Sequence, residues 1–403
     1  MGRMADRAAM RILQIHNFYQ QSGGEDVVLA NEEKLLTRHG HEVSQYLLHN
    51  DSIPGMSKFQ VSLDTLWNAG AYQSVRRKIQ KLGIDVVHVH NTFPLVSPAV
   101  YYAARAENVP VVQTLHNYRL LCPSATFFRQ GINCEDCLGK FFPWPAIAHR
   151  CYRNNAPATA ITALMLSTHR ALGTYSSKVD RYIALSQFSL EKFVAGGLPR
   201  ARMQVKSNFV LEDPGIGSGY GGYALFVGRL APEKGVQTLL NAWSALKQPI
   251  KLKIAGNGPL RPAVETIVKA DPRIEYLGQC PRPRINELMR NAALLVFPSE
   301  WYECSPLSVM ESMACGTPVI APALGSLSEM IVSGANGFLF PPDDPSGHTG
   351  ALVASLEKLF AGKDYLDNMR YSTRQYYETH FAAGPNYESL LKIYNSVLPA
   401  PLR

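Results

Sequence analysis

The chain of 403 residues is long enough for two or three domains of ordinary size, and its 46% hydrophobic and 10% aromatic content is typical of globular proteins. Its formal charge of +8 comes from scattered Lys and Arg, and since no basic stretch is interleaved with aromatic residues, nucleic acid is not an expected partner. No run approaches the roughly 20 apolar residues of a membrane span, and segment 1–10 lacks a secretory apolar core, so we expect a cytoplasmic protein.

Short apolar runs alternate with longer amphipathic ones along the first half, which predicts parallel βαβ construction. A helix is expected after Gly23-Gly24 and should end near Gly40, and a later helix is closed by Gly196-Gly197. The expected strands of this half are 11–16, 85–90, 110–116 and 182–186.

A glycine-rich stretch at 212–222 separates the halves and predicts a flexible hinge. Beyond it the alternation restarts, with strands expected at 223–227, 252–255, 274–277, 294–297 and 318–321. The sequence therefore predicts an α/β protein of two doubly wound domains. Ligands of such sheets bind at the carboxyl ends of the strands, so we expect the site in a cleft between the two halves.

The domain boundaries follow from these patterns. The first domain is expected over 1–210, with a cysteine-containing insertion at about 118–155, and the second over 211–375. A helical segment over 376–403 completes the chain and is expected to pack back on the first domain.

The segment from Glu303 to Glu311 is the most informative of the chain. Ser305 is expected to cap a helix over about 306–315, with Pro306 in its first turn and Gly316 at its exit. Glu311 would be the only charge on this helix, and Glu303 would lie at its positive end, an arrangement that suits a ligand with both hydroxyls and phosphate. A sugar nucleotide is such a ligand. The alternative is a buried helix with one tolerated glutamate.

Two loops of the second half could contact the same ligand. Arg229 and Lys234 follow the strand at 223–227 and are suited to bind a diphosphate. Gly256-Asn257-Gly258 follows the next strand, where the glycines permit close backbone approach. Taken alone, this glycine motif equally predicts an ordinary tight turn.

Four of the seven cysteines lie in or beside the expected insertion. A Cys-x2-Cys pair with two outlying cysteines fits a tetrahedral structural zinc site. Reduced thiols or a redox pair are the alternative. The four residues are Cys122, Cys134, Cys137 and Cys151.

These motifs, in this order, resemble family 4 of the retaining, nucleotide-sugar-dependent glycosyltransferases (glycosyl transferases group 1). The resemblance covers nearly the full chain. It implies the GT-B fold, in which two Rossmann-like domains face each other across a cleft: an acceptor-side N-terminal domain and a C-terminal domain that binds the nucleotide sugar. The matching segments are Gly23-Gly24, 114–117, 228–235, 256–259, 303–311 and 315–321.

The resemblance also implies roles for individual residues. Arg229 and Lys234 would hold the donor diphosphate, Glu303 the sugar hydroxyls and Glu311 the ribose hydroxyls. The backbone from Ser305 to Leu307 and the Gly23-Gly24 loop would approach the sugar and phosphates. His116 would lie near the reacting sugar, although a structural role for this histidine is the alternative. Pro306 departs from the glycine of many relatives, which puts the donor contacts in doubt.

The function implied is a hexosyltransferase-type reaction that moves a sugar from a nucleoside diphosphate to a saccharide or lipid-linked saccharide in polysaccharide or glycoconjugate synthesis. No cofactor is required for transfer, and any zinc would be structural. The alternatives are a GT-B sugar-nucleotide epimerase or hydrolase, and a non-catalytic carbohydrate-binding protein. Ile161, Leu164, Met165 and Leu172, with Arg170 nearby, are compatible with peripheral contact with the inner membrane face, and equally with core packing.

Overall fold

The computed structural model describes residues 9–21, 23–342, 347–361 and 365–399, so most of segment 1–10 lies outside the described residues. The chain divides into two compact units. The first comprises residues 1–127, 135–207 and 386–403, and the second comprises residues 128–134 and 208–385.

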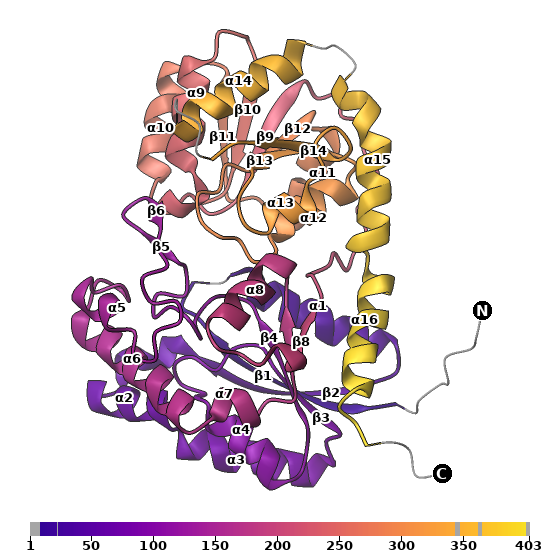
Figure 1. The fold of residues 1–403 in the computed structure, drawn as a ribbon. Helices are drawn as coiled ribbons and strands as arrows, with labels where there is room; N and C mark the ends of the chain where they lie inside the picture. The colour runs from indigo at the N-terminus through magenta and orange to yellow at the C-terminus, as the bar shows by residue number, and fades with distance from the viewer. Residues whose placement is uncertain (1–8, 22, 343–346, 362–364, 400–403) are drawn as a thin grey trace. The chain divides into compact units, whose positions relative to one another are not determined.

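The first unit is built on a parallel sheet of six strands in the order β2-β1-β3-β4-β7-β8 (Figure 1). Its central strands are completely buried, since they carry Val, Ile and Leu on both faces. The strands are β1 (Arg11–Phe18), β2 (Glu42–His49), β3 (Val86–Val89), β4 (Val111–Leu115), β7 (Arg181–Ala184) and β8 (Met203–Val205).

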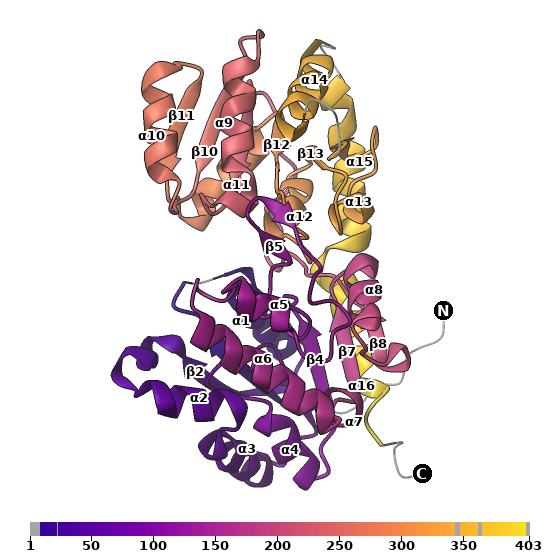
Figure 2. The ribbon, with the colours of Figure 1, turned by 60° about the vertical axis from the view of Figure 1, so that its left-hand side comes forward.

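Helices cover this sheet, and α6 packs beside both α2 and α5 (Figure 2). The helices are α1 (Gly24–Arg38), α2 (Lys58–Leu66), α3 (Ala69–Leu82), α4 (Ala99–Ala106), α5 (Trp144–Ala148), α6 (Ala156–Ala171), α7 (Thr174–Ser177) and α8 (Gln187–Ala195), with 3-10 turns η1 (Asn50–Gly55) and η2 (Arg200–Arg202).

The second unit has its own parallel six-stranded sheet, in the order β11-β10-β9-β12-β13-β14. The strands are β9 (Tyr223–Val227), β10 (Lys251–Ala255), β11 (Ile274–Gly278), β12 (Leu294–Val296), β13 (Val319–Pro322) and β14 (Gly337–Phe340). A short antiparallel hairpin, β5 (Phe128–Arg129) and β6 (Ile132–Asn133), also belongs to this unit, and Asn133 donates a 3.0 Å hydrogen bond to the carbonyl of Glu300.

Two apolar cores flank this second sheet, one centred on Trp243 and the other on Met310. The helices that enclose them are η3 (Pro232–Lys234), α9 (Val236–Ala245), α10 (Arg261–Ala270), α11 (Arg282–Asn291), α12 (Leu307–Ala314), α13 (Leu327–Met330), α14 (Gly347–Ala361) and α15 (Tyr365–His380). The α/β class and the two doubly wound sheets are thus confirmed.

Both strand orders reverse direction at one point, between β1 and β3 in the first sheet and between β9 and β12 in the second. Ligands of open α/β sheets bind beside such a switch point, at the carboxyl ends of the strands. The loops after these four strands are therefore where each unit should carry its functional side chains.

The glycine-rich stretch 212–222 is not a free hinge. Backbone N–H groups of Gly217, Gly219 and Gly221 donate to carbonyls of the second unit at 2.9–3.0 Å, and Arg370 donates to the carbonyl of Gly217. A Cβ on Gly217 would lie 2.1 Å from the carbonyl oxygen of Arg290, so glycine is needed here for packing. The chain passes between the units at 207/208 instead.

The last helix, α16 (Ala383–Asn395), returns the chain to the first unit, with which residues 386–403 cluster. Leu390, Ile393 and Tyr394 are buried in the same core as Ile12 and Val86. No helix in the described part of the chain combines the length and apolarity needed to cross a bilayer.

Candidate functional site

The loops after β9 and β10 interlock through glycines. A Cβ on Gly256 would lie 1.9 Å from the carbonyl oxygen of Gly228, and one on Gly258 would lie 2.5 Å from that of Leu230. Leu230 N–H in turn donates to the carbonyl of Asn257 at 2.9 Å. Loop packing alone therefore requires glycine at 256 and 258, while the Asn257 side chain stays exposed.

Lys234 and Glu303 meet beside the switch point of the second sheet. Lys234 Nζ lies 2.6 Å from Glu303 Oε1, which also accepts a 2.7 Å hydrogen bond from Ser299 Oγ. Only 7% of the Glu303 side chain is exposed, against 21% for Lys234. Lys234 also lies over the Trp301 ring, 4.9 Å from its centroid. The structure thus joins two of the predicted donor residues in one charged, largely buried cluster.

Arg229 is placed differently from Lys234. Its side chain is about half exposed and forms an ion pair with Glu233, one turn further along the same loop. Gly235 ends this loop with a φ of +68°, and a Cβ there would lie 1.8 Å from the carbonyl oxygen of Pro298. Arg229 therefore lies at the surface, on a loop whose other end is packed tightly at Gly235.

Helix α12 begins one residue later than the sequence predicts. Pro306 is its N-cap residue, with extended backbone and no side-chain cap, and Ser305 lies outside the helix. Ser305 Oγ instead accepts a 3.3 Å hydrogen bond from the N–H of Asn208. The predicted capping role of Ser305 is wrong, because Pro306 takes the non-helical φ/ψ of the cap position. Gly316 follows the helix with a φ of +70°, as predicted.

Glu311 lies on the buried side of α12, with 5% of its side chain exposed, and it forms an ion pair with Arg282 at the start of α11. Leu307 is partly exposed at the first position of the helix. Arg282 belongs to none of the motifs, so this contact with Glu311 could not be predicted from the sequence.

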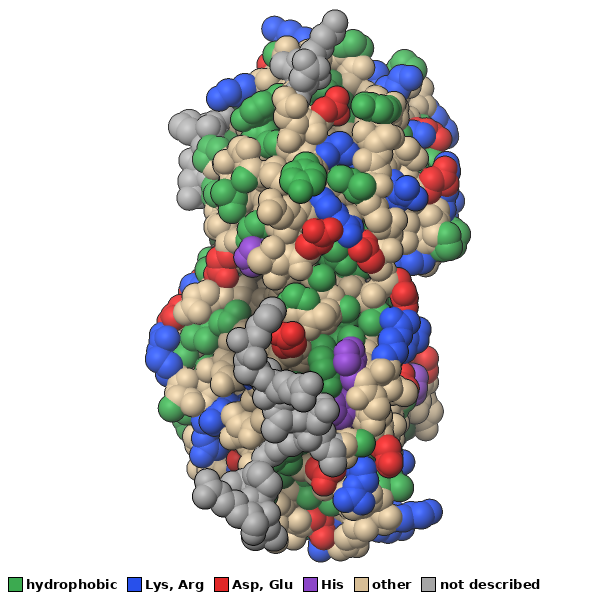
Figure 3. All heavy atoms as spheres, turned by 90° about the vertical axis from the view of Figure 1, so that its right-hand side faces the viewer, with side chains coloured by type: hydrophobic (Ala, Val, Ile, Leu, Met, Phe, Trp, Pro, Cys, Tyr) green, Lys and Arg blue, Asp and Glu red, His purple; other side chains and the backbone are tan. Residues whose placement is uncertain are grey.

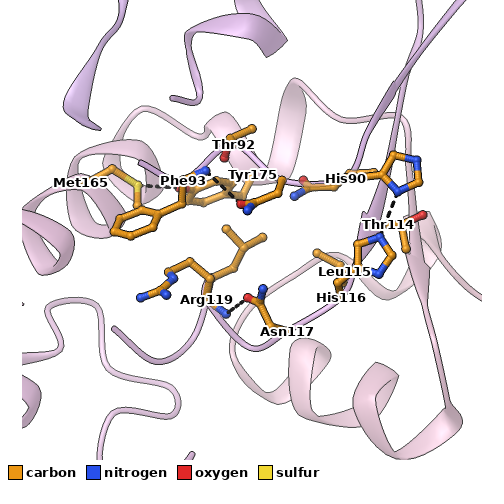
Figure 4. Close-up of a pocket in the computed structure, with 13 residues that line it drawn as sticks. His90, Thr92, Phe93, Thr114, Leu115, His116, Asn117, Arg119, Met165 and Tyr175 are labelled. Atoms are coloured by element: carbon orange, nitrogen blue, oxygen red, sulfur yellow. Dashed lines mark hydrogen bonds between the residues drawn. The ribbon is translucent and has the colours of Figure 1, made fainter. Parts of the chain in front are cut away.

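In the first unit, a small polar recess lies among the segments that follow β3 and β4 (Figure 4). Its volume is about 30 Å³, which is room for one water molecule or one hydroxyl group but not for a sugar ring. His116, Asn117 and Arg119 come from one loop, and the segment from His90 to Phe93 comes from the other. The guanidinium of Arg119 stacks over the Phe93 ring at 4.2 Å.

His116 is held by a second histidine. Its Nε2 lies 2.9 Å from Nδ1 of His90, and the two rings stack with their centroids 5.2 Å apart (Figure 4). Burial lowers the pKa of His116 well below its usual value, and His90 adds to this shift. Burial and the neighbouring His88 lower the pKa of His90 to about 4. Both rings are therefore neutral at pH 7.

The loop with Gly23 and Gly24 leads into α1. Gly23 is the N-cap residue, its N–H donates to Asp26 at 2.9 Å, and a Cβ there would meet no protein atom within 4 Å. Glu25, on the first turn, accepts hydrogen bonds from the side-chain amides of Asn91 and Asn117 at 3.1 Å. Although Glu25 is partly exposed, burial and Asp26 raise its pKa to about 8.

Sequence reasoning missed two acidic residues of this unit, Glu25 and Glu32, because both lie in a charged helix that reads as a surface helix. Glu32 is completely buried, and its Oε1 lies 2.8 Å from His88 Nδ1 and 3.3 Å from His90 Nε2. Burial alone would raise the pKa of Glu32, but the contacts with His88 and His90 hold it well below its usual range.

Two groups among the described residues bring three potential metal-ligating atoms within 4.8 Å of one another. One is Glu32 with His88 and His90, and the other is His16 with Glu25 and Asp26. Lys206 lies beside the first group and would compete with a metal ion for its carboxylate, because Lys206 Nζ is 3.6 Å from Glu32 Oε2.

Of the four predicted zinc ligands, two are buried and two are partly exposed. Cys134 belongs to the second unit and the other three to the first. Four thiols are a donor set that zinc prefers, and the zinc site stays a prediction. The residues are Cys122, Cys134, Cys137 and Cys151.

Both units match known protein families. Residues 22–211 match the domain described as Glycosyltransferase Family 4, and residues 221–358 match Glycosyl transferases group 1. An uncharacterized glycosyltransferase of Methanocaldococcus jannaschii is 25% identical over 84% of this chain and 86% of its own. The α-D-kanosaminyltransferase of Streptomyces kanamyceticus is 26% identical over 68% of this chain and 70% of its own.

Solved structures share the fold. Anabaena HepE in complex with UDP and glucose aligns with 96% of this chain and 100% of its own, with a TM-score of 0.68 and 18% identity. Sucrose-phosphate synthase from Thermosynechococcus elongatus aligns with 96% of this chain and 99% of its own, with a TM-score of 0.71 and 16% identity.

Proposed function

Because the chain belongs to family 4 of the glycosyltransferases and has the GT-B fold, we propose that it transfers a hexosyl group, with retention, to a hydroxyl of a saccharide or lipid-linked saccharide. That the donor is a nucleotide sugar follows from the family. The acceptor and the stereochemical course are the parts of this proposal that need experiment.

The contact between Lys234, Glu303 and Ser299 carries the proposal. It places an ammonium group and a carboxylate at the switch point of the second sheet, where ligands of such sheets bind. An ammonium suits a diphosphate, and a carboxylate with free lone pairs suits sugar hydroxyls. Few ligands other than a sugar nucleotide present both groups within one molecule.

The roles follow from this geometry. Lys234, with Arg229 from the same loop, would offset the negative charge that develops on the departing diphosphate. Glu303 would accept hydrogen bonds from the sugar once Lys234 turns to the phosphates. Glu311, kept in place by Arg282, would accept from the ribose hydroxyls. The UDP and glucose bound in the structure of HepE, which shares the fold, support the proposal of a nucleoside diphosphate at this site.

In the first unit, we place an acceptor or sugar hydroxyl at the recess beside His116. The recess fits one hydroxyl group, and a neutral histidine can accept its proton in a hydrogen bond. Gly23 contributes open space at the start of α1. The polar side chains around the recess are thus suited to orient a hydroxyl rather than to bind a whole ring.

Peripheral membrane contact would bring the enzyme to a lipid-linked acceptor. Leu164 and Leu172 are 44% and 59% exposed on α6, with Arg170 close by, whereas Met165 is buried in the core. Trp144 of the neighbouring α5 is 59% exposed. The face shown in Figure 3 lies away from α5 and α6, and there Lys and Arg side chains are interspersed with Asp and Glu.

The proposal is tested by a panel of nucleoside diphosphate sugars, read by release of the nucleoside diphosphate, with and without lipid extract. Release that depends on an added acceptor, with the α-anomeric product from an α-linked donor, supports retaining transfer. Release of free sugar without any acceptor would instead show an epimerase or hydrolase. Donor binding without release under any condition would show a non-catalytic carbohydrate-binding protein.

A further inference from the structure

A buried chain of side chains connects α1 to the recess in the first unit. Glu32 Oε1 lies 3.3 Å from Nε2 of His90, and Nδ1 of His90 lies 2.9 Å from Nε2 of His116. Glu32 and His90 are 1% and 3% exposed. Within the described chain, neither Glu32 Oε1 nor His90 Nε2 makes a hydrogen bond of regular geometry, so the contact between them is electrostatic, and Glu32 Oε1 also faces His88 Nδ1 at 2.8 Å.

We propose that Glu32 and His90 are positioning residues that hold His116 in one tautomer, with Nε2 protonated and Nδ1 free to accept a hydrogen bond from a substrate hydroxyl. This inference rests on the proposed transferase function. Neither Glu32 nor His90 belongs to any of the motifs that the sequence analysis identified.

The tautomers follow from donor and acceptor counting. An ionised Glu32 can only accept, so its negative charge 3.3 Å from Nε2 of His90 favours the tautomer of His90 that carries its proton on Nε2. Nδ1 of His90 is then an acceptor, and the hydrogen that lies between the two rings must belong to Nε2 of His116. Only Nδ1 of His116 remains unprotonated. A freely rotating or untethered His116 would populate both tautomers, and the Nδ1-protonated molecules would present a donor where an acceptor is needed.

A metal ion is a poorer occupant of the same cluster. Glu32 already faces the ammonium of Lys206, 3.6 Å from its Oε2, and both side chains are at least 97% buried. A divalent ion would add two further positive charges to this pair in a place that water cannot reach. The surrounding groups are already accounted for: His88 contacts Glu32, Thr114 and Tyr394, and His16 contacts Asp26.

His90→Leu and His90→Asn form the test. Leucine removes both ring nitrogens, whereas the asparagine amide places a polar atom near the position of Nδ1. We expect kcat to fall about 10- to 100-fold in His90→Leu with KM changed less than about 3-fold, as for other groups that orient a functional imidazole, and largely to recover in His90→Asn. Tyr387→Phe, which removes a hydrogen bond between α16 and His41, the residue before β2, is the matched control.

A second measurement is independent of turnover. In protein with 15N-labelled histidine, the ring nitrogens of His116 should show protonated Nε2 and unprotonated Nδ1, and His90→Leu should replace this pattern with a mixture of tautomers. Glu32→Gln is measured together with Lys206→Met, which keeps the buried charge balanced, and it should have the same effect.

These readouts separate the two proposals. If no donor is turned over but His116 has the expected tautomer, the transferase proposal fails and the positioning chain stands. A Nδ1-protonated His116, or a folded His90→Leu enzyme with unchanged kcat, would overturn the chain. So would a stoichiometric metal ion that His90→Leu removes, because metal-bound Nε2 cannot carry the proton.

Discussion

Replacing Glu303 with glutamine tests the central contact of the proposed donor site. The glutamine is isosteric, so the loop should keep its shape, but the charge that faces Lys234 Nζ at 2.6 Å and Ser299 Oγ at 2.7 Å is lost. Glu303 is also the group we assign to the sugar hydroxyls. The substitution should therefore slow transfer without preventing folding.

The magnitude follows from the burial of the pair. Only 7% of the Glu303 side chain is exposed, so water screens the contact weakly. A charged hydrogen bond of this kind that is lost in the transition state costs about 2–4 kcal/mol, or roughly a 30- to 1000-fold fall in kcat/KM. Part of the effect comes from the ammonium of Lys234 left without its partner, which a double-mutant cycle with Lys234→Met separates.

The assay is release of the nucleoside diphosphate under saturating donor, with thermal melting measured in parallel. Glu265→Gln is the matched control, because Glu265 pairs with Arg261 on exposed α10 and surface pairs of this type contribute little. Turnover of Glu303→Gln within about twofold of the wild type, in a folded protein, would refute the assignment of Glu303 to the donor.

Three further predictions concern other groups. Arg229→Ala and Lys234→Ala should each weaken binding of free UDP or GDP in calorimetric titrations, while Glu303→Gln should spare it; equal affinities would remove the diphosphate role. Protein purified without added zinc should contain about one zinc per chain and Cys134→Ser should lose it, whereas metal-free, folded protein would support reduced thiols. Burial raises the pKa of Glu25 from 4.5 to about 8, so the folded state holds a proton that the unfolded chain releases. Wild-type stability should therefore fall, relative to Glu25→Gln, as pH rises from about 5 to about 8, and parallel denaturation midpoints would contradict this.

The central strands were predictable because a buried parallel strand is an unbroken apolar run. Expected segments 223–227 and 294–297 correspond to β9 (Tyr223–Val227) and β12 (Leu294–Val296). The edge strand β2 (Glu42–His49) was missed, since it is only half buried and carries polar residues on both faces. Periodicity alone cannot distinguish such a strand from a loop.

The site was predictable where local chemistry fixes it and not where packing does. Lys234 and Glu303 stand 69 residues apart in the sequence. Each lies in the loop that follows a strand, β9 for Lys234 and β12 for Glu303, and these two loops meet at one switch point. Glu32 has no such signal, because only its burial beneath β3 turns an ordinary helical glutamate into a partner for two histidines. At the start of α12 the sequence offers both Ser305 and Pro306, and Pro306 takes the N-cap position.

Because α16 returns the chain to the first unit, the second unit is an insertion within the first. This affects the order in which the parts of each unit are synthesised. The core around Ile12 and Val86 includes Leu390, Ile393 and Tyr394, which leave the ribosome last. The strands of the first sheet end at Val205, but the second unit ends at residue 385, so its cores are complete in the chain before this core of the first unit can close. Domains usually fold in the order of synthesis. In this chain the unit that we propose binds the donor, although encoded second, is the first whose core can form in full.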